Sequence, residues 1–205
     1  MRHNYVADIG DFYKYKLLRD ICGRTKEGIK GKKLGVVWYL YTDKCKEGDG
    51  KFTEYLFDDN ADEKRAEDPE LFDALKAIIE NDKRSIDSIR KSEILPFNTS
   101  YYETALTLSH LPKGTREAIE LRLKHRQKWL EGALEATEGC EVVFFDPDNG
   151  LEIKSVAKHY DNAPKFTFYD ELLPFWNRGQ SLIIYQHINR TKSVEKQIAK
   201  RVEEL

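Results

Sequence analysis

Cysteine, long apolar runs and an excess of either charge are scarce in this chain of 205 residues. Its three cysteines, Cys22, Cys45 and Cys140, stand far apart and form neither a CxxC motif nor a Cys/His pair. The spacing therefore indicates neither a disulfide framework nor a zinc site, and a cytoplasmic protein is the simplest interpretation.

No apolar run approaches the ~20 residues that a membrane-spanning helix needs. The polar start Met1-Arg2-His3-Asn4 also lacks the features of a signal peptide, so we expect no contact with a membrane. The 34 Lys and Arg residues balance 36 Asp and Glu residues, which gives a net charge of -2. Because no positive field covers the whole chain, any nucleic-acid surface must be local.

What the chain does contain is enough apolar sequence for one core. Hydrophobic residues make up 40% of it, and no shift in composition marks a linker, so we expect residues 1–205 to form a single domain. Strand-like runs alternate with helical patterns. This order is typical of an α/β fold with an open, mostly parallel sheet and helices on both faces.

Four segments carry the continuous β-branched and aromatic runs of buried strands: 34–41, 141–146, 166–169 and 181–186. Apolar residues three and four apart predict helices over 11–24, from 68 onward, and over 85–91, 115–137, 170–178 and 193–205. Residues 58–68 are expected to form a charged loop. Residues 94–108 fit an extended or a short helical segment equally well.

Polar side chains follow each predicted strand. Ligands of open parallel sheets bind beyond the carboxyl ends of the strands, so these positions are the candidates for a site. They are Asp43, the segment Asp146-Pro147-Asp148-Asn149-Gly150, Asp170-Glu171 and the segment His187-Ile188-Asn189-Arg190. For Asp170 we favour a helix-capping role. Segment 146–150 has more carboxylate than a turn requires, which predicts the functional site there.

Two chemistries fit segment 146–150. A carboxylate and backbone carbonyls held by Pro147 can accept hydrogen bonds from an amino group and so polarise its nitrogen. Alternatively, Asp146, Asp148 and Glu152 offer Mg²⁺ the hard oxygen ligands it prefers, with Lys154 facing an anionic transition state. The segment also spells the nuclease pattern PD...(D/E)xK, but the elements stand too close together for the hairpin that normally carries them.

Further polar residues are candidates for the same cleft. His187 and Arg190 can hold a phosphate or a base edge, or they are a carbonyl-bonded histidine and a surface arginine paired with a carboxylate. Near the chain start, Asp8, Asp11, Lys14 and Lys16 mark the first helix. Asp11 fits a helix cap, and Lys14, one turn later, is placed to enter the cleft.

Basic residues outnumber acidic ones on the predicted helix 115–137. A solvated face is the simpler interpretation and contact with a phosphate backbone is the alternative. Trp129 is expected in the core and not on a stacking surface. The basic residues are Arg116, Arg122, Lys124, His125, Arg126 and Lys128.

Two groups of motifs resemble known families. Gly10-Asp11-Phe12-Tyr13-Lys14-Tyr15, with Asp146-Pro147 after an apolar strand, resembles the bacterial ribosomal-RNA adenine-N6 methyltransferases and the related three-Cys-motif partner proteins. This resemblance implies a Rossmann-like fold and S-adenosylmethionine as cofactor. Segment 144–152, FFDPDNGLE, together with 181–187 is also similar to a bacterial and phage family, and that similarity implies no activity.

The methyltransferase resemblance implies roles for individual positions. Asp146 and Pro147 would take the first two places of the catalytic motif, with Asp146 accepting from the target amine, and Lys14 would lie beside the cofactor. The second proline and the stacking aromatic of that motif are replaced by Asp148 and Asn149. No glycine-rich turn directly follows residues 34–41.

The predicted site therefore has three parts. Its catalytic candidates are Asp146, Pro147, Asp148 and His187; its cofactor-binding candidates are Lys14 and Asp43, the latter for a ribose; its substrate-binding candidates are Asn149 and Arg190, the latter for a phosphate.

The predicted function is that of a methyltransferase-like enzyme that acts on nucleic acid or a nucleotide with S-adenosylmethionine. One alternative is a Mg²⁺-dependent phosphodiesterase or nuclease-like enzyme built on Asp146, Asp148 and Glu152. Another is a non-catalytic module of phage or host-defence type that binds a nucleotide or a protein. The oligomeric state stays open.

Overall fold

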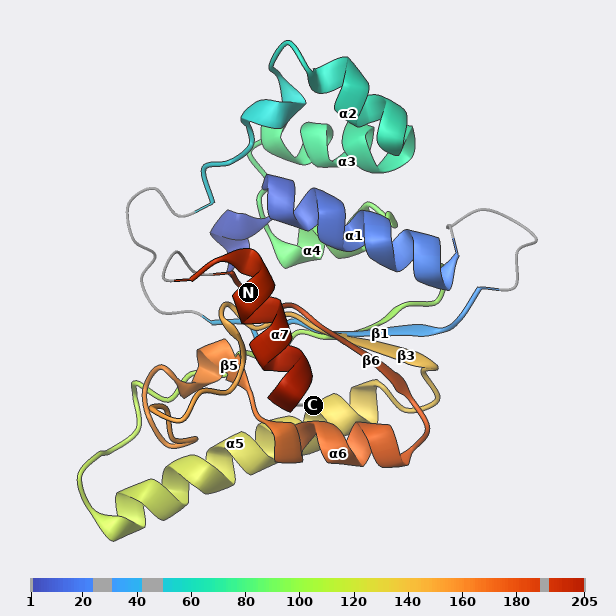
Figure 1. The fold of residues 1–205 in the computed structure, drawn as a ribbon. Helices are drawn as coiled ribbons and strands as arrows, with labels where there is room; N and C mark the ends of the chain where they lie inside the picture. Colours follow the sequence, from blue (N-terminus) through green and yellow to red (C-terminus); the bar gives the residue numbers. More distant parts are fainter. Residues whose placement is uncertain (1, 24–30, 42–49, 189–191, 205) are drawn as a thin grey trace.

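A central parallel sheet organises the chain, which we describe from a computed structural model over residues 2–23, 31–41, 50–188 and 192–204. Four strands lie in the order β2-β1-β3-β6, and each pair is parallel (Figure 1). They are β1 (Leu34–Val37), β2 (Ser100–Tyr102), β3 (Val142–Phe145) and β6 (Ser181–Ile184). The expected α/β fold with an open parallel sheet, consistent with a Rossmann-like arrangement, is confirmed.

Helices cover both faces of this sheet (Figure 1). One face carries α1 (Ile9–Cys22), α2 (Ala61–Glu67), α3 (Pro69–Glu80) and α4 (Ile86–Lys91), while α5 (Arg116–Ala136) and α6 (Tyr169–Asn177) lie on the other. The chain also forms α7 (Val194–Glu204) and three short 3-10 helices, η1 (His3–Tyr5), η2 (Glu54–Leu56) and η3 (Ala163–Lys165).

Apolar side chains pack on both faces of the sheet, and β3 contributes to both layers. Val142 and Phe144 pack toward α1, α3 and α4, and Val143 and Phe145 pack toward α5 and α6. Side chains of a strand alternate between its faces, so a strand buried on both sides must be apolar throughout. This is why the sequence VVFF carries no polar residue.

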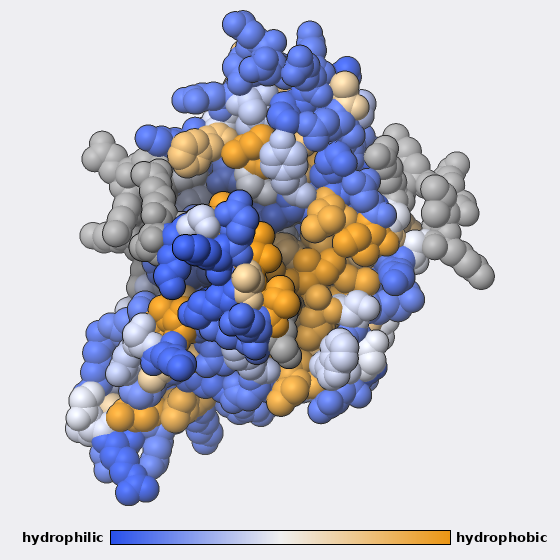
Figure 2. Space-filling view, viewed as in Figure 1, coloured by the Kyte–Doolittle hydropathy of each residue, from blue (hydrophilic) through white to orange (hydrophobic). Residues whose placement is uncertain are grey.

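Strand β6 is an edge strand, and its side chains are only partly buried beyond Ser181. Figure 2 shows apolar surface gathered between α1 and α6, beside α7. On α1, Leu17 is 50% exposed. Among the described helices, none has the length and apolar character needed to cross a bilayer.

Side chains cap the starts of two helices, α3 and α5. Asp68 accepts from the backbone N–H of Leu71 at 3.2 Å, and Pro69 occupies the first helical position of α3. Thr115 caps α5 in the same way. These side chains satisfy N–H groups that have no partner within the helix.

The prediction of a loop over 58–68 is wrong, because α2 occupies most of it. Acidic Asp62 and Glu63 stand in its first turn and basic Lys64 and Arg65 in its last, which suits the helix dipole. Arg65 also pairs with Asp73 of α3 at 2.7 Å. The undecided segment 94–108 contains the edge strand β2.

The prediction that 166–169 joins the main sheet is also wrong. Its strand β5 (Phe166–Thr167) pairs instead with β4 (Gly150–Leu151) in a separate two-stranded sheet. The exit at Asp170-Glu171 therefore does not meet the other strand ends. Phe168, and not Asp170, is the cap residue of α6.

Two basic residues of α5 are internal, against the idea of a phosphate-binding face that includes them. Arg122 donates to the carbonyl of His159 at 2.5 Å. Arg126 donates to both carboxylate oxygens of Glu171, at 2.6 and 2.9 Å, and to the carbonyl of Phe166 at 2.8 Å. Trp129 is buried, as expected, at 4% exposure.

Arg126→Met should lower the free energy of unfolding by about 3–5 kcal/mol, because it removes the guanidinium that binds both oxygens of the buried Glu171 carboxylate and leaves only Lys158, at 3.8 Å. Urea unfolding measures the loss. The matched control Lys128→Met, on the exposed side of α5, should change stability by about 0.5 kcal/mol or less. Equal effects of the two changes would contradict a structural role for Arg126.

Candidate functional site

A cavity of about 440 Å³ opens at the carboxyl end of β3. The chain passes from β1 to β2 on one side and returns to β3 on the other, so the strand order reverses between β1 and β3. Ligands of open α/β sheets bind at such a switch point, and the volume lies within the usual range of ligand sites. The lining residues are Tyr5, Asp8, Ile9, Gly10, Lys14, Gly50, Phe52, Asp146, Pro147, Asp148, Asn149, Lys165, Tyr185 and His187.

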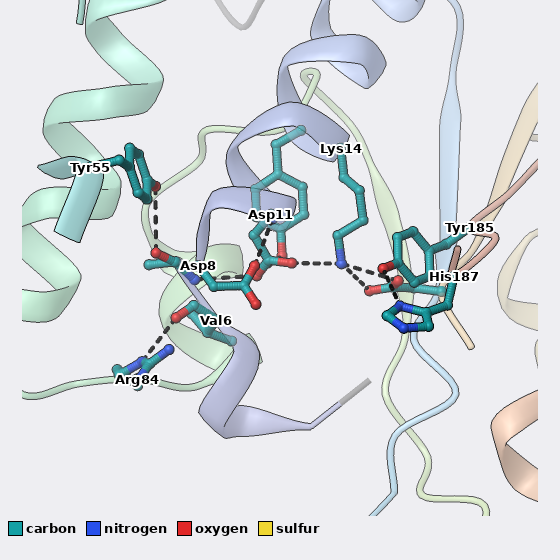
Figure 3. Close-up of polar contacts among 11 residues, drawn as sticks. Val6, Asp8, Asp11, Lys14, Tyr55, Arg84, Tyr185 and His187 are labelled. Carbon is teal, nitrogen blue, oxygen red and sulfur yellow. Dashed lines mark hydrogen bonds and ion pairs between the residues drawn. The ribbon is translucent and has the colours of Figure 1, made fainter. Parts of the chain in front are cut away.

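Lys14 joins the first helix to the end of β3 in this cavity (Figure 3). Its Nζ lies 3.1 Å from both carboxylate oxygens of Asp146 and 2.6 Å from Oδ1 of Asp11. The ring of Tyr185 lies 4.9 Å from the same ammonium, centroid to Nζ. Both aspartates are almost fully buried, at 0% and 2% exposure. One cation therefore bridges two buried carboxylates.

Asp11 is held from three sides. Its Oδ2 accepts from the backbone N–H of Ala7 at 3.2 Å and from the hydroxyl of Tyr15 at 3.0 Å. The capping role considered for Asp11 belongs to Asp8, whose Oδ1 accepts from the Asp11 N–H at 3.0 Å. Asp11 thus turns inward, toward Lys14.

Burial changes the protonation of this cluster. It raises the pKa of Asp11 from 3.8 to about 7, against the attraction of Lys14, and the charges of Asp8 and Asp146 add to the rise. Burial alone would lower the pKa of Lys14, but the carboxylates of Asp11 and Asp146 outweigh it and the pKa is raised. The raised pKa therefore predicts that the Asp11 carboxyl, and not Lys14, titrates near neutral pH.

Segment 146–150 is clamped by its neighbours. The N–H of Asn149 donates to the carbonyl of Lys165 at 2.9 Å, and its own carbonyl accepts from Nε2 of Gln186 at 3.2 Å. Gln186 also accepts from the N–H of Leu151 at 3.0 Å. Gly150 has φ of +104°, and a Cβ there would collide with the Gln186 side chain. The clamp explains why this segment ends in glycine.

Six of the predicted site residues line one cavity: Lys14, Asp146, Pro147, Asp148, Asn149 and His187. His187 is exposed, and its Nδ1 lies 3.4 Å from the hydroxyl of Tyr185. Asp43 and Arg190 lie outside the described residues.

The metal set suggested by the sequence is not assembled. Asp146 contacts Lys14, Asp148 lies 3.6 Å from Nε of Arg2, and Glu152 accepts from the N–H of Tyr169 at 2.8 Å. Within the described ranges, no three His, Cys, Asp or Glu residues come together as a metal-binding group. The geometry thus gives the Mg²⁺ alternative no support.

The sequence assigns no role of their own to several residues of the site. Tyr15, Tyr185 and Gln186 act through contacts that join distant segments, and no spacing rule reveals such contacts. For Asp11 the sequence predicts a place near the cleft, and the spacing of three residues between Asp8, Asp11 and Lys14 is the signal for its contact with Lys14.

Comparison with models of protein families, with curated proteins and with solved structures finds no match.

Gly150→Ala should destabilise the protein by about 1–3 kcal/mol, since the new methyl group meets Gln186 at a backbone conformation that suits glycine. Gly114→Ala is the control: its φ is +87°, but nothing lies within 4 Å. Gly114→Ala should reduce stability less than Gly150→Ala does. Thermal unfolding of the two variants measures the difference. A Gly150→Ala loss no larger than that of the control would show that the Gln186 clamp is unimportant.

The contribution of Asp11 to the free energy of unfolding should fall as pH rises from about 4 to about 7. In that interval the native state keeps a proton that the unfolded chain has released, because the pKa of Asp11 is raised from 3.8 to about 7. Above this interval the contribution is constant.

Asp11→Asn mimics the protonated carboxyl and should remove this slope. Denaturant unfolding of both proteins at several pH values measures the difference between them. The exposed Asp62→Asn is the control and should leave the slope unchanged. Parallel pH profiles for the wild type and Asp11→Asn would contradict the raised pKa.

Proposed function

We propose that this chain is a methyltransferase-like enzyme that uses S-adenosylmethionine to methylate an amino group of a nucleic-acid base or a nucleotide. The contact between Lys14 and Asp146 carries the proposal. These residues belong to the two motifs of the methyltransferase resemblance, stand 132 positions apart, and meet at 3.1 Å in the switch-point cavity. Their meeting supports a common site for both motifs.

Asp146 is the proposed acceptor for the target amine. Each oxygen of a carboxylate can accept from more than one donor, so contact with Lys14 is compatible with a hydrogen bond from an amine. The N–H of Asp146 donates to the carbonyl of Val37 at 3.0 Å, which fixes the residue against β1. Buried Pro147 stiffens the chain directly after it. An amine hydrogen-bonded to Asp146 would present its nitrogen lone pair in a constant direction.

The cavity chemistry fits a cationic cofactor. S-adenosylmethionine supplies a methyl group from a positively charged sulfonium. The three acidic side chains of the lining, Asp8, Asp146 and Asp148, outnumber its two lysines, Lys14 and Lys165, and this balance favours a cation.

The backbone after β1 is constrained at one residue, Tyr39. Tyr39 adopts φ of +45°, a conformation more usual for glycine. Its ring lies 4.6 Å from that of Trp129, centroid to centroid, on the α5 side of the sheet. The glycine-rich turn that the resemblance implies would follow residue 41, and residues 42–49 lie outside the described residues.

The first test is calorimetric titration with S-adenosylmethionine in the presence of a chelator. We expect saturable binding near one site per chain, and transfer of a labelled methyl group to RNA, DNA or nucleotides. Asp146→Asn should lower the transfer rate by about 10²–10⁴-fold, because it removes the charged acceptor. Thermal unfolding of the variant checks that the loss does not come from misfolding.

Asp170→Asn is the matched control, since Asp170 also follows a strand but lies outside the cavity lining. It should transfer methyl groups at the wild-type rate. A wild type that does not bind S-adenosylmethionine would refute the proposal. Cofactor binding without transfer to any of these substrates would favour the non-catalytic module.

A further inference from the structure

Phe52 is an exposed aromatic residue in the wall of the cavity. Its side chain is 57% exposed, although a buried phenylalanine would contribute about 1.5–3 kcal/mol to stability. The carbonyl of Phe52 accepts from the N–H of Ile9 at 2.9 Å. This bond fastens the residue to the first turn of α1, the helix that carries Lys14. The backbone at Phe52 therefore has a defined position relative to Asp146.

Two lysines lie at this cavity, one beside Phe52 and one in the lining. Nζ of Lys51 is 6.0 Å from the ring centroid of Phe52, and Lys165 lines the cavity itself. Exposed aromatic rings beside cations are typical of surfaces that stack an unpaired base and hold its phosphate. At the cavity floor, Asp146 offers an acceptor for an amino group. Aromatic, cationic and acceptor groups thus occur together in one site.

We propose that Phe52 is the stacking platform for an unpaired nucleobase, and that Lys51 and Lys165 bind its phosphate. Phe52 thereby supplies the aromatic group that the segment 146–149 lacks at Asn149. The platform is a substrate-binding role. This inference rests on the proposed methyltransferase function for what happens to the bound base, namely methylation. Stacking of the base on Phe52 does not itself require methyl transfer.

The test uses a single-stranded oligonucleotide with one 2-aminopurine, whose fluorescence falls when the base stacks on an aromatic ring. We expect the wild type to bind this probe and quench it. Phe52→Leu keeps an apolar side chain but loses the ring, so binding should weaken by about 5- to 100-fold and quenching should disappear. Phe52→Tyr should restore both, and the exposed position should leave folding intact.

Phe57→Leu is a matched control. Phe57 is 51% exposed and lies 5.2 Å from Nζ of Lys76, centroid to nitrogen, but it does not line the cavity. Loss of the Phe57 ring should change neither binding nor quenching of the probe. Replacing Lys51 or Lys165 by Gln should weaken binding and reduce its dependence on salt, as expected when one phosphate contact is lost. The 2-aminopurine nucleotide alone shows whether a free nucleotide suffices or a strand is needed.

Calorimetry with S-adenosylmethionine on the same variants separates the two proposals. Probe stacking that depends on Phe52, without cofactor binding, would support the platform and refute the methyltransferase. A wild type that does not bind the probe, or a Phe52→Leu variant that binds and quenches it normally, would overturn the platform. If Phe52→Leu weakens binding of S-adenosylmethionine but not binding of the probe, the ring belongs to the cofactor site. This result would also overturn the platform.

Discussion

The ammonium of Lys14 between two buried carboxylates is the interaction on which the site depends. Without it, Asp11 and Asp146 would face each other as like charges with little solvent to screen them. The ion pairs also connect the first helix to the strand at the centre of the sheet. Stability and site geometry therefore depend on the same contact. The ammonium of Lys14 compensates the two buried carboxylates, and it also fixes the position of Asp146, the proposed acceptor.

Constrained backbone surrounds this contact. Ala7 and Tyr39 adopt positive φ, and Gly150 does so within the clamped segment. Each such non-glycine conformation costs free energy and persists only where neighbouring contacts hold it. Here Ala7 is held through Asp11 and Tyr55, and Tyr39 packs its ring against the core. Ala7 and Gly150 directly adjoin the lining residues Asp8 and Asn149, so packing fixes the backbone at two borders of the cavity.

Periodicity predicted most of the elements, and its failures have physical causes. Segment 58–68 looked like a loop because α2 has no buried residue of its own, so its charge pattern and its packing on α3 stabilise it instead. Segment 166–169 has the composition of a central strand, yet it pairs with Gly150-Leu151. Apolar runs reveal burial, but the choice of strand partner depends on contacts between distant residues.

The sequence alone determined the α/β class, the main buried strands and the concentration of polar residues after β3, because these follow from local patterns of burial and from strand ends. Tertiary structure decided which of those residues act together. It paired Lys14 with Asp146, turned Glu152 toward the start of α6, and brought Phe52 to the cavity. Such pairings arise from the crossing of chain segments in space, and no local spacing rule encodes them.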